Sequence, residues 1–228
     1  MCCQLHLLIN NFINREPSVE RSLEYNWFGW DNESTNELFR LFHNDLIKAI
    51  ENNVQQNNTY RLKNCITRIL KWGGITTPGA LSERYAKMIT NVWSFSPPEQ
   101  PSEIDYNRII GEEDETPLSS WTKILAAYNP EAFCIYDART GVALRYLTEE
   151  NWYLPHYTRT YNKAIKKIIR FYNGTSKTPN QLSHRESYKK YMKFLEETHD
   201  PVGYERKLFM LGGLLQFNDS QNTVIVTR

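Results

Sequence analysis

Apolar residues recur at intervals of three and four along most of the chain, the spacing that places them on one face of an α-helix. The clearest case is 36–54, where apolar side chains from Leu38 to Ile50 alternate with polar ones. An amphipathic helix is predicted there. The same pattern predicts helices at 61–71, 79–93, 119–128, 137–147, 156–171 and 183–198. Only the terminal TVIVTR has the pattern of a strand, so we expect a mainly α fold.

Polar and helix-breaking residues set the expected boundaries. Ser34 or Thr35 can cap the first helix, since a hydroxyl satisfies free amides at a helix start. Glycine tolerates the left-handed conformation that ends helices, so the sequence Trp72-Gly73-Gly74 should end the second. Residues 94–117 are rich in proline and acid. We therefore expect an N-terminal helical lobe at 1–100, a connection at 101–117 and a second lobe at 118–228.

Composition narrows the class of protein. The chain has 228 residues, 40% of them hydrophobic, and a net charge of +1, which fits a globular protein and argues against one that coats nucleic acid by bulk charge. The four cysteines form no metal-binding spacing, so we expect free thiols, a cytoplasmic location and no metal or cofactor. No signal peptide or membrane span is expected, and the chain is expected to be a monomer.

The segment 117–144, PLSSWTKILAAYNPEAFCIYDARTGVAL, contains the candidate chemistry. In its first helix the apolar residues share one face, so Lys123 should lie at the edge of that face or away from it. Taken alone, Lys123 would be a solvated side chain. Asp137 follows an apolar run and precedes a helix, where a carboxylate caps free amides and interacts favourably with the helix dipole. Capping is the ordinary structural role of Asp137.

Together these residues resemble the helix–hairpin–helix DNA glycosylases, particularly their 8-oxoguanine glycosylase branch. The matching residues are Thr122-Lys123, the turn at Asn129-Pro130, and Asp137 at the end of the apolar run from Cys134. The resemblance covers about 28 residues of this chain. It implies a two-lobed helical glycosylase fold. The hairpin is divergent, because Ser119 and Trp121 stand where the family has glycines that approach DNA phosphates.

The resemblance implies that Lys123 and Asp137 are a catalytic pair. Breaking an N-glycosidic bond places positive charge on the sugar, and the carboxylate of Asp137 would stabilise that charge. A neutral Lys123 amine would then attack the anomeric carbon and form a Schiff base. Alternatively, Asp137 would activate a water molecule and leave an intact abasic site. The sequence leaves both routes open.

The implied partner is double-stranded DNA with the target base turned into a pocket. Candidate phosphate contacts are Ser119, Ser120, Thr122 and Arg139, and candidate pocket rings are Trp72, Trp121 and Tyr136. Two basic helix faces could also hold phosphates, although solvated faces are the ordinary interpretation. Their cations are Arg159, Lys163, Lys166, Lys167 and Arg170 in one, and Lys189, Lys190 and Lys193 in the other.

Four functions remain after other enzyme motifs are excluded. Members of the family that resemble this compact form act in bacterial defence, so the leading hypothesis is excision of a hypermodified base, such as glucosylated hydroxymethylcytosine, from phage DNA. The divergent hairpin and the supply of aromatic residues favour it. An 8-oxoguanine repair glycosylase with lyase activity is the alternative. A non-catalytic helical DNA-binding or partner-binding protein is the alternative of another class, and a preference for single strands would favour an RNA-acting or nuclease-associated protein.

Overall fold

The computed structural model describes residues 4–16, 23–24, 31–56, 59–92, 118–130, 132–154, 163–175 and 182–227. The chain forms two compact units. Unit 1 comprises residues 1–27 and 136–228, and unit 2 comprises residues 28–135. This division differs from the one expected at 101–117, a segment that lies outside the described residues. Lys123 and Asp137 consequently belong to different units.

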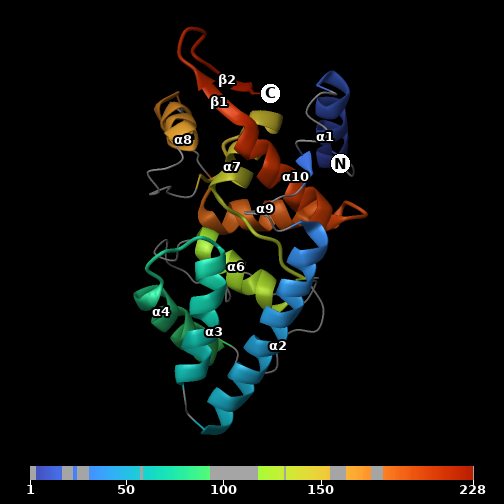
Figure 1. Cartoon of the computed structure of the whole chain (residues 1–228). Helices are drawn as coiled ribbons and strands as arrows, with labels where there is room; N and C mark the ends of the chain where they lie inside the picture. The colour runs from blue at the N-terminus through green and yellow to red at the C-terminus, as the bar shows by residue number, and fades with distance from the viewer. Residues whose placement is uncertain are drawn as a thin grey trace. The chain divides into compact units, whose positions relative to one another are not determined.

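Unit 2 is built from four described helices, α2 (Asn32–Gln56), α3 (Thr59–Trp72), α4 (Gly79–Val92) and α6 (Leu118–Tyr128). Helices α2 and α3 lie side by side, and α6 packs against both (Figure 1). Their apolar faces meet in a core whose most buried members include Leu46, Leu62, Ile66, Ile69 and Ile124. Because α6 completes the core made by the earlier helices, it groups with them and not with the C-terminal half of the chain.

Helix α3 ends as the glycine pair predicts. Gly74 adopts a left-handed conformation with φ 80°, and its amide donates to the carbonyl of Lys71 at 2.9 Å. The amide of Ile75 donates back to the carbonyl of Leu70 at 2.8 Å. These two bonds form a Schellman motif, which satisfies carbonyls that a helix end otherwise leaves unpaired.

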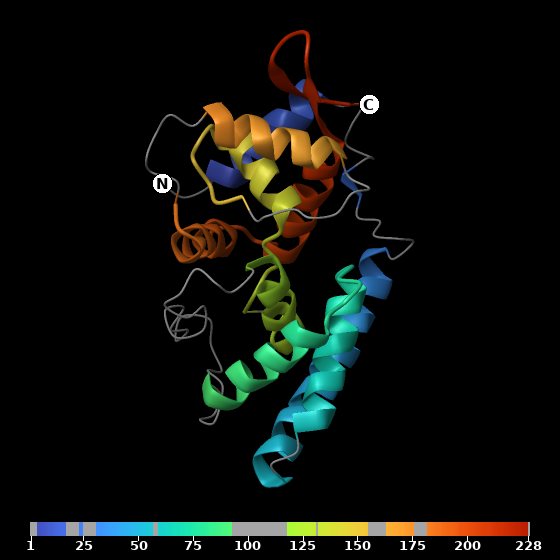
Figure 2. The ribbon, with the colours of Figure 1, turned by 90° about the vertical axis from the view of Figure 1, so that its left-hand side faces the viewer.

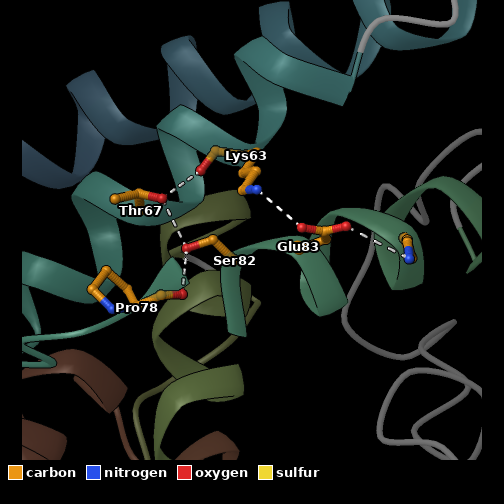
Figure 3. A network of polar contacts seen from close by, with 6 residues as sticks. Lys63, Thr67, Pro78, Ser82 and Glu83 are labelled. Carbon is orange, nitrogen blue, oxygen red and sulfur yellow. Dashed lines mark hydrogen bonds and ion pairs between the residues drawn. The ribbon is translucent and has the colours of Figure 1, made fainter. Parts of the chain in front are cut away.

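A chain of hydroxyl groups joins α3 to α4 (Figure 3). Thr67 Oγ1 donates to Ser82 Oγ at 2.8 Å, and Ser82 Oγ donates to the carbonyl of Pro78 at 2.9 Å. Ser82 is buried. On the exposed side of the same contact, Lys63 and Glu83 form an ion pair at 3.0 Å. The hydrogen bonds of the buried Ser82 hydroxyl fix how the two helices pack, whereas an exposed ion pair contributes little.

Unit 1 contains α1 (Gln4–Arg15), α7 (Ala138–Thr148), α8 (Lys163–Thr175), α9 (His184–Glu196), α10 (Pro201–Leu214), β1 (Leu215–Asn218) and β2 (Thr223–Val226). Helix α7 contacts α1, α8 and α10, and Figure 2 shows α8 lying across it. The two strands form an antiparallel hairpin in which Leu215 pairs with Val226 and Asn218 with Thr223. The first turn of α7 is thereby held within a packed helical unit.

The mainly α expectation is confirmed for the described residues, since every predicted helix has a counterpart. Three elements were not predicted. They are helix α1, helix α10 and strand β1, which pairs with the strand predicted from TVIVTR. For the predicted helix 156–171, residues 156–162 lie outside the described residues. Its described part is α8, which continues to Thr175.

Candidate functional site

The helix that carries Lys123 is buried on nearly all sides. Of its residues, only Ser119 retains intermediate exposure. Lys123 itself is 7% exposed, so the expectation of a solvated lysine is wrong. The position of Lys123 relative to the apolar face of α6 does not decide whether Lys123 is buried, because α2 and α3 both pack against α6. Lysine is seldom buried to this degree, which makes its environment informative.

The Lys123 amine is held by a residue of its own helix. Its Nζ donates to the carbonyl oxygen of Ser119 at 2.7 Å and to Ser119 Oγ at 2.9 Å. Residues four apart lie one turn apart on the same helix face, so the side chain folds back along α6 toward its N-terminus. Ser119, predicted as a phosphate contact, is therefore a hydrogen-bond partner of the predicted nucleophile.

Gly73 provides the space for this lysine. A Cβ atom at Gly73 would lie 2.3 Å from Lys123 Cδ and 2.7 Å from Cε, well inside van der Waals contact. Any larger residue would therefore collide with the lysine stem. The turn that ends α3 thus also shapes the site of Lys123. The sequence predicts only a helix stop at Gly73 and gives no sign of its contact with residue 123.

The residues between Ser119 and Lys123 are core residues in this conformation. Trp121 is completely buried, and its ring centroid lies 5.1 Å from that of Tyr85. The hydroxyls of Tyr85 and Ser120 share a hydrogen bond, and burial raises the pKa of Tyr85 to about 12. Thr122 is also buried. The structure thus presents no exposed surface of Ser120, Trp121 or Thr122 to a phosphate or a base.

Trp72 is the one candidate ring that is only partly buried. It packs edge-on against Phe39, with ring centroids 4.9 Å apart, and against Phe42 at 6.3 Å. Its indole Nε1 is buried and makes no hydrogen bond to the described residues. Since Trp72 directly precedes Gly73, this ring belongs to the same turn that contacts Lys123.

In unit 1, Asp137 caps helix α7. Its Oδ1 accepts hydrogen bonds from the backbone amides of Arg139 at 2.8 Å and Thr140 at 3.0 Å. The capping role is therefore confirmed. Its Oδ2 accepts no hydrogen bond from the described part of the chain, and the side chain is partly exposed. One carboxylate oxygen is thus fixed by the helix, and the other remains able to interact with a ligand.

Tyr136 and Arg139 flank this carboxylate in sequence but differ in environment. Tyr136 is completely buried, donates its hydroxyl to the carbonyl of Tyr153 at 2.7 Å, and has its pKa raised by burial. It therefore offers no ring face to a base in this structure. The Arg139 guanidinium lies 4.7 Å from the ring centroid of Phe209 on α10, where a cation–π contact orients it.

The backbone of the same turn is set by a glycine on α10. A Cβ atom at Gly212 would lie 2.1 Å from the carbonyl oxygen of Arg139. The close approach of α10 to the first turn of α7 therefore requires glycine. The sequence alone gives no sign of this role, since Gly212 is simply the first glycine of a pair.

Among the described residues, no group of histidine, cysteine, aspartate or glutamate side chains could hold a metal ion. No helix in that part of the chain is long and apolar enough to cross a membrane. Comparison with known proteins found no matching family model, no similar curated protein and no similar solved structure.

Proposed function

We propose that this protein is a DNA glycosylase in which Asp137 and Lys123 act on the target nucleotide. The observation that carries the proposal is the burial of Lys123, with its amine held by Ser119 and its stem lying against Gly73. A lysine kept in such surroundings is typical of a nucleophile, because amine reactivity depends on desolvation. The resemblance of 117–144 to the helix–hairpin–helix glycosylases supports the assignment.

Asp137 supplies the carboxylate that the reaction needs. As the C1′–N bond breaks, the base leaves with the bonding electron pair and positive charge develops on the sugar. The Oδ2 atom of Asp137, which no described residue occupies, is available to stabilise that charge. Oδ1 meanwhile stays bonded to the amides of Arg139 and Thr140, so the catalytic group is oriented before the substrate arrives.

The covalent route assigns the next step to Lys123. Its neutral amine forms a bond to C1′, and one amine proton passes to O4′ as the C1′–O4′ bond breaks and the sugar ring opens. The second amine proton passes to the departed base, which leaves the Schiff base. In the hydrolytic route, water adds to C1′ after giving a proton to Asp137, and the departing base is protonated in turn. Both routes require Asp137, and only the first requires Lys123.

The proposed substrate is a hypermodified base in duplex DNA of phage origin. Base release should be measured on DNA containing glucosylated hydroxymethylcytosine, on an 8-oxoguanine duplex and on unmodified DNA. Release from the glucosylated DNA alone is the expected result. Release from the oxidised duplex alone would assign the enzyme to repair, and release from none of the three would contradict a glycosylase with either substrate.

Asp137→Asn tests the carboxylate without removing the helix cap, because asparagine caps as well as aspartate. Base release should fall by about a hundredfold or more, with little change in thermal stability. Asp200→Asn is the matched control. Asp200 caps α10 through a 2.9 Å bond from the amide of Gly203, so its variant should retain full activity. Equal activity of both variants would exclude a catalytic Asp137.

Borohydride reduction during turnover then distinguishes the two routes. A Schiff base at Lys123 is converted to a stable protein–DNA cross-link, and Lys123→Gln should abolish the cross-link. A wild-type protein that releases base without being trapped would assign the hydrolytic route. Cross-linking that persists in Lys123→Gln would show that another amine is the nucleophile.

A further inference from the structure

Helix α8 carries a row of positive charge. Lys163, Lys166, Lys167 and Arg170 lie three or four residues apart, and the helix contains no acidic residue. Side chains at this spacing share one helix face, which we call the basic face of α8. Lys163, Lys167 and Arg170 are exposed. Neither Lys163 nor Arg170 forms an ion pair with a described residue.

The opposite face of α8 is used for packing. Ile165 is 1% exposed and Ile168 is completely buried, and the helix packs against α7 and β1. Figure 2 shows α8 lying along the outside of unit 1. A basic amphipathic helix that binds membranes inserts its apolar side chains into the bilayer. Those of α8 are already buried in the protein, so the basic face favours a polyanion that needs charge alone.

One acidic residue from the adjacent hairpin reaches this face. Asp219, in the turn after β1, forms an ion pair with Lys167, and the Lys167 amine also lies 5.5 Å from the ring centroid of Phe217. Both partners of the ion pair are substantially exposed. Asp219 therefore holds Lys167 in place and also competes with any anion that would bind it.

We propose that the basic face of α8 binds the phosphate backbone of duplex DNA. This proposal rests on the proposed function, because it names the surface that would hold the DNA during base excision. The small net charge of +1 means that affinity for DNA must come from a local concentration of cations. The other basic helix, α9, is less suitable, since it contains Glu186 and Glu196 and its Lys190 pairs with Glu150.

The double variant Lys163→Glu with Arg170→Glu tests the proposal. Its affinity for an unmodified duplex at low salt should fall by about tenfold or more. The dependence of log affinity on log salt concentration should become shallower by about two, because each lost phosphate contact removes about one unit. The matched control is Lys48→Glu with Arg61→Glu, which has the same net charge and alters exposed cations on α2 and α3.

Asp219→Asn should have the opposite effect. Removing this carboxylate releases Lys167 for a phosphate, so affinity for the duplex should rise by about two- to threefold and the salt dependence should steepen by up to about one unit. A gain in affinity cannot result from misfolding. Unchanged or weaker binding by Asp219→Asn, or equal losses in the α8 variant and its control, would overturn the proposal.

Two further measurements separate this inference from the proposed function and from other polyanions. Suppose that the wild-type protein releases no base, and that duplex binding is lost in the Lys163→Glu, Arg170→Glu variant but not in its control. The glycosylase proposal then fails and the binding surface stands. If base release depends on Asp137 but the α8 variant binds like wild type, the binding surface fails alone. Preferential binding to vesicles of phosphatidylcholine and phosphatidylserine, or to single-stranded RNA, would also overturn the duplex assignment.

Discussion

The first turn of α7 and the middle of α6 hold their candidate catalytic residues in different ways. Asp137 is fixed by backbone amides one turn ahead of it, whereas Lys123 is fixed by packing and by Ser119 one turn behind it. In each region a glycine from outside the helix allows close approach, Gly212 from α10 and Gly73 from the turn after α3. Gly212 meets the backbone of Arg139, and Gly73 meets the side chain of Lys123. Backbone atoms near Gly212 cannot move aside as easily as the lysine side chain near Gly73, so a larger residue should be tolerated less well at Gly212.

The largest expected effect comes from Gly212→Ala. Its new Cβ would lie 2.1 Å from the carbonyl oxygen of Arg139 and 2.6 Å from the carbonyl carbon. Backbone atoms cannot move aside as a side chain does, so α10 or the first turn of α7 must shift. We expect a loss of about 3 kcal/mol or more in the free energy of unfolding, measured as a fall of several degrees in melting temperature.

Gly213→Ala is the matched control for this prediction. Gly213 lies in the same helix, but its Cβ would meet only the Arg139 guanidinium, with Nη1 at 3.6 Å and Cζ at 3.8 Å. These are ordinary contacts, and alanine is a better helix former than glycine by about 1 kcal/mol. Gly213→Ala should therefore be neutral or stabilising. Similar melting temperatures for the two variants would contradict the close approach of α10 to α7.

A smaller effect is expected from Gly73→Ala, because the lysine stem that it meets is flexible. The loss should be about 1–2 kcal/mol, and Lys123→Ala in the same protein should remove most of it. Chemical denaturation of the two single variants and the double variant gives the coupling free energy. A coupling free energy near zero would show that Gly73 and Lys123 do not touch. The proposed function would then lose the packing of Lys123 against Gly73 on which it rests.

The two regions also differ in how well the sequence predicts them. A carboxylate just before a helical segment indicates a cap, and the structure confirms Asp137 as one, because capping involves only neighbouring residues. The burial of Lys123 depends on Gly73, fifty positions earlier, and on the packing of α6 against α2 and α3. The periodicity of a sequence does not show how helices are arranged in space. The position of Lys123 relative to the apolar face of its helix predicts a place at the edge of that face. The packing of α2 and α3 against α6 buries it instead.

The same reasoning explains the division into units. Some helix boundaries follow from local signals such as Gly74, which ends α3 as expected. Others do not, since α2 begins at Asn32 and includes the expected caps Ser34 and Thr35. The change of composition at 94–117 favours a lobe boundary in a segment outside the described residues, and that boundary stays a prediction. The compact unit that begins at Phe28 ends at Ile135. The apolar residues of α6 join the core that α2 and α3 begin. Which helices share a core is decided by complementary packing, and no local pattern specifies it.

The smallest expected effect concerns the cap itself and separates its two oxygens. Asp137→Ala removes the bonds to the amides of Arg139 and Thr140 and should cost about 1 kcal/mol in the free energy of unfolding. Asp137→Ser restores a capping oxygen without a carboxylate, so it should recover most of that stability while base release stays as low as in Asp137→Ala. Chemical denaturation and the base-release assay check the two parts. If serine restored activity together with stability, Asp137 would act only as a cap, and the distinction between its bound Oδ1 and its available Oδ2 would have no catalytic meaning.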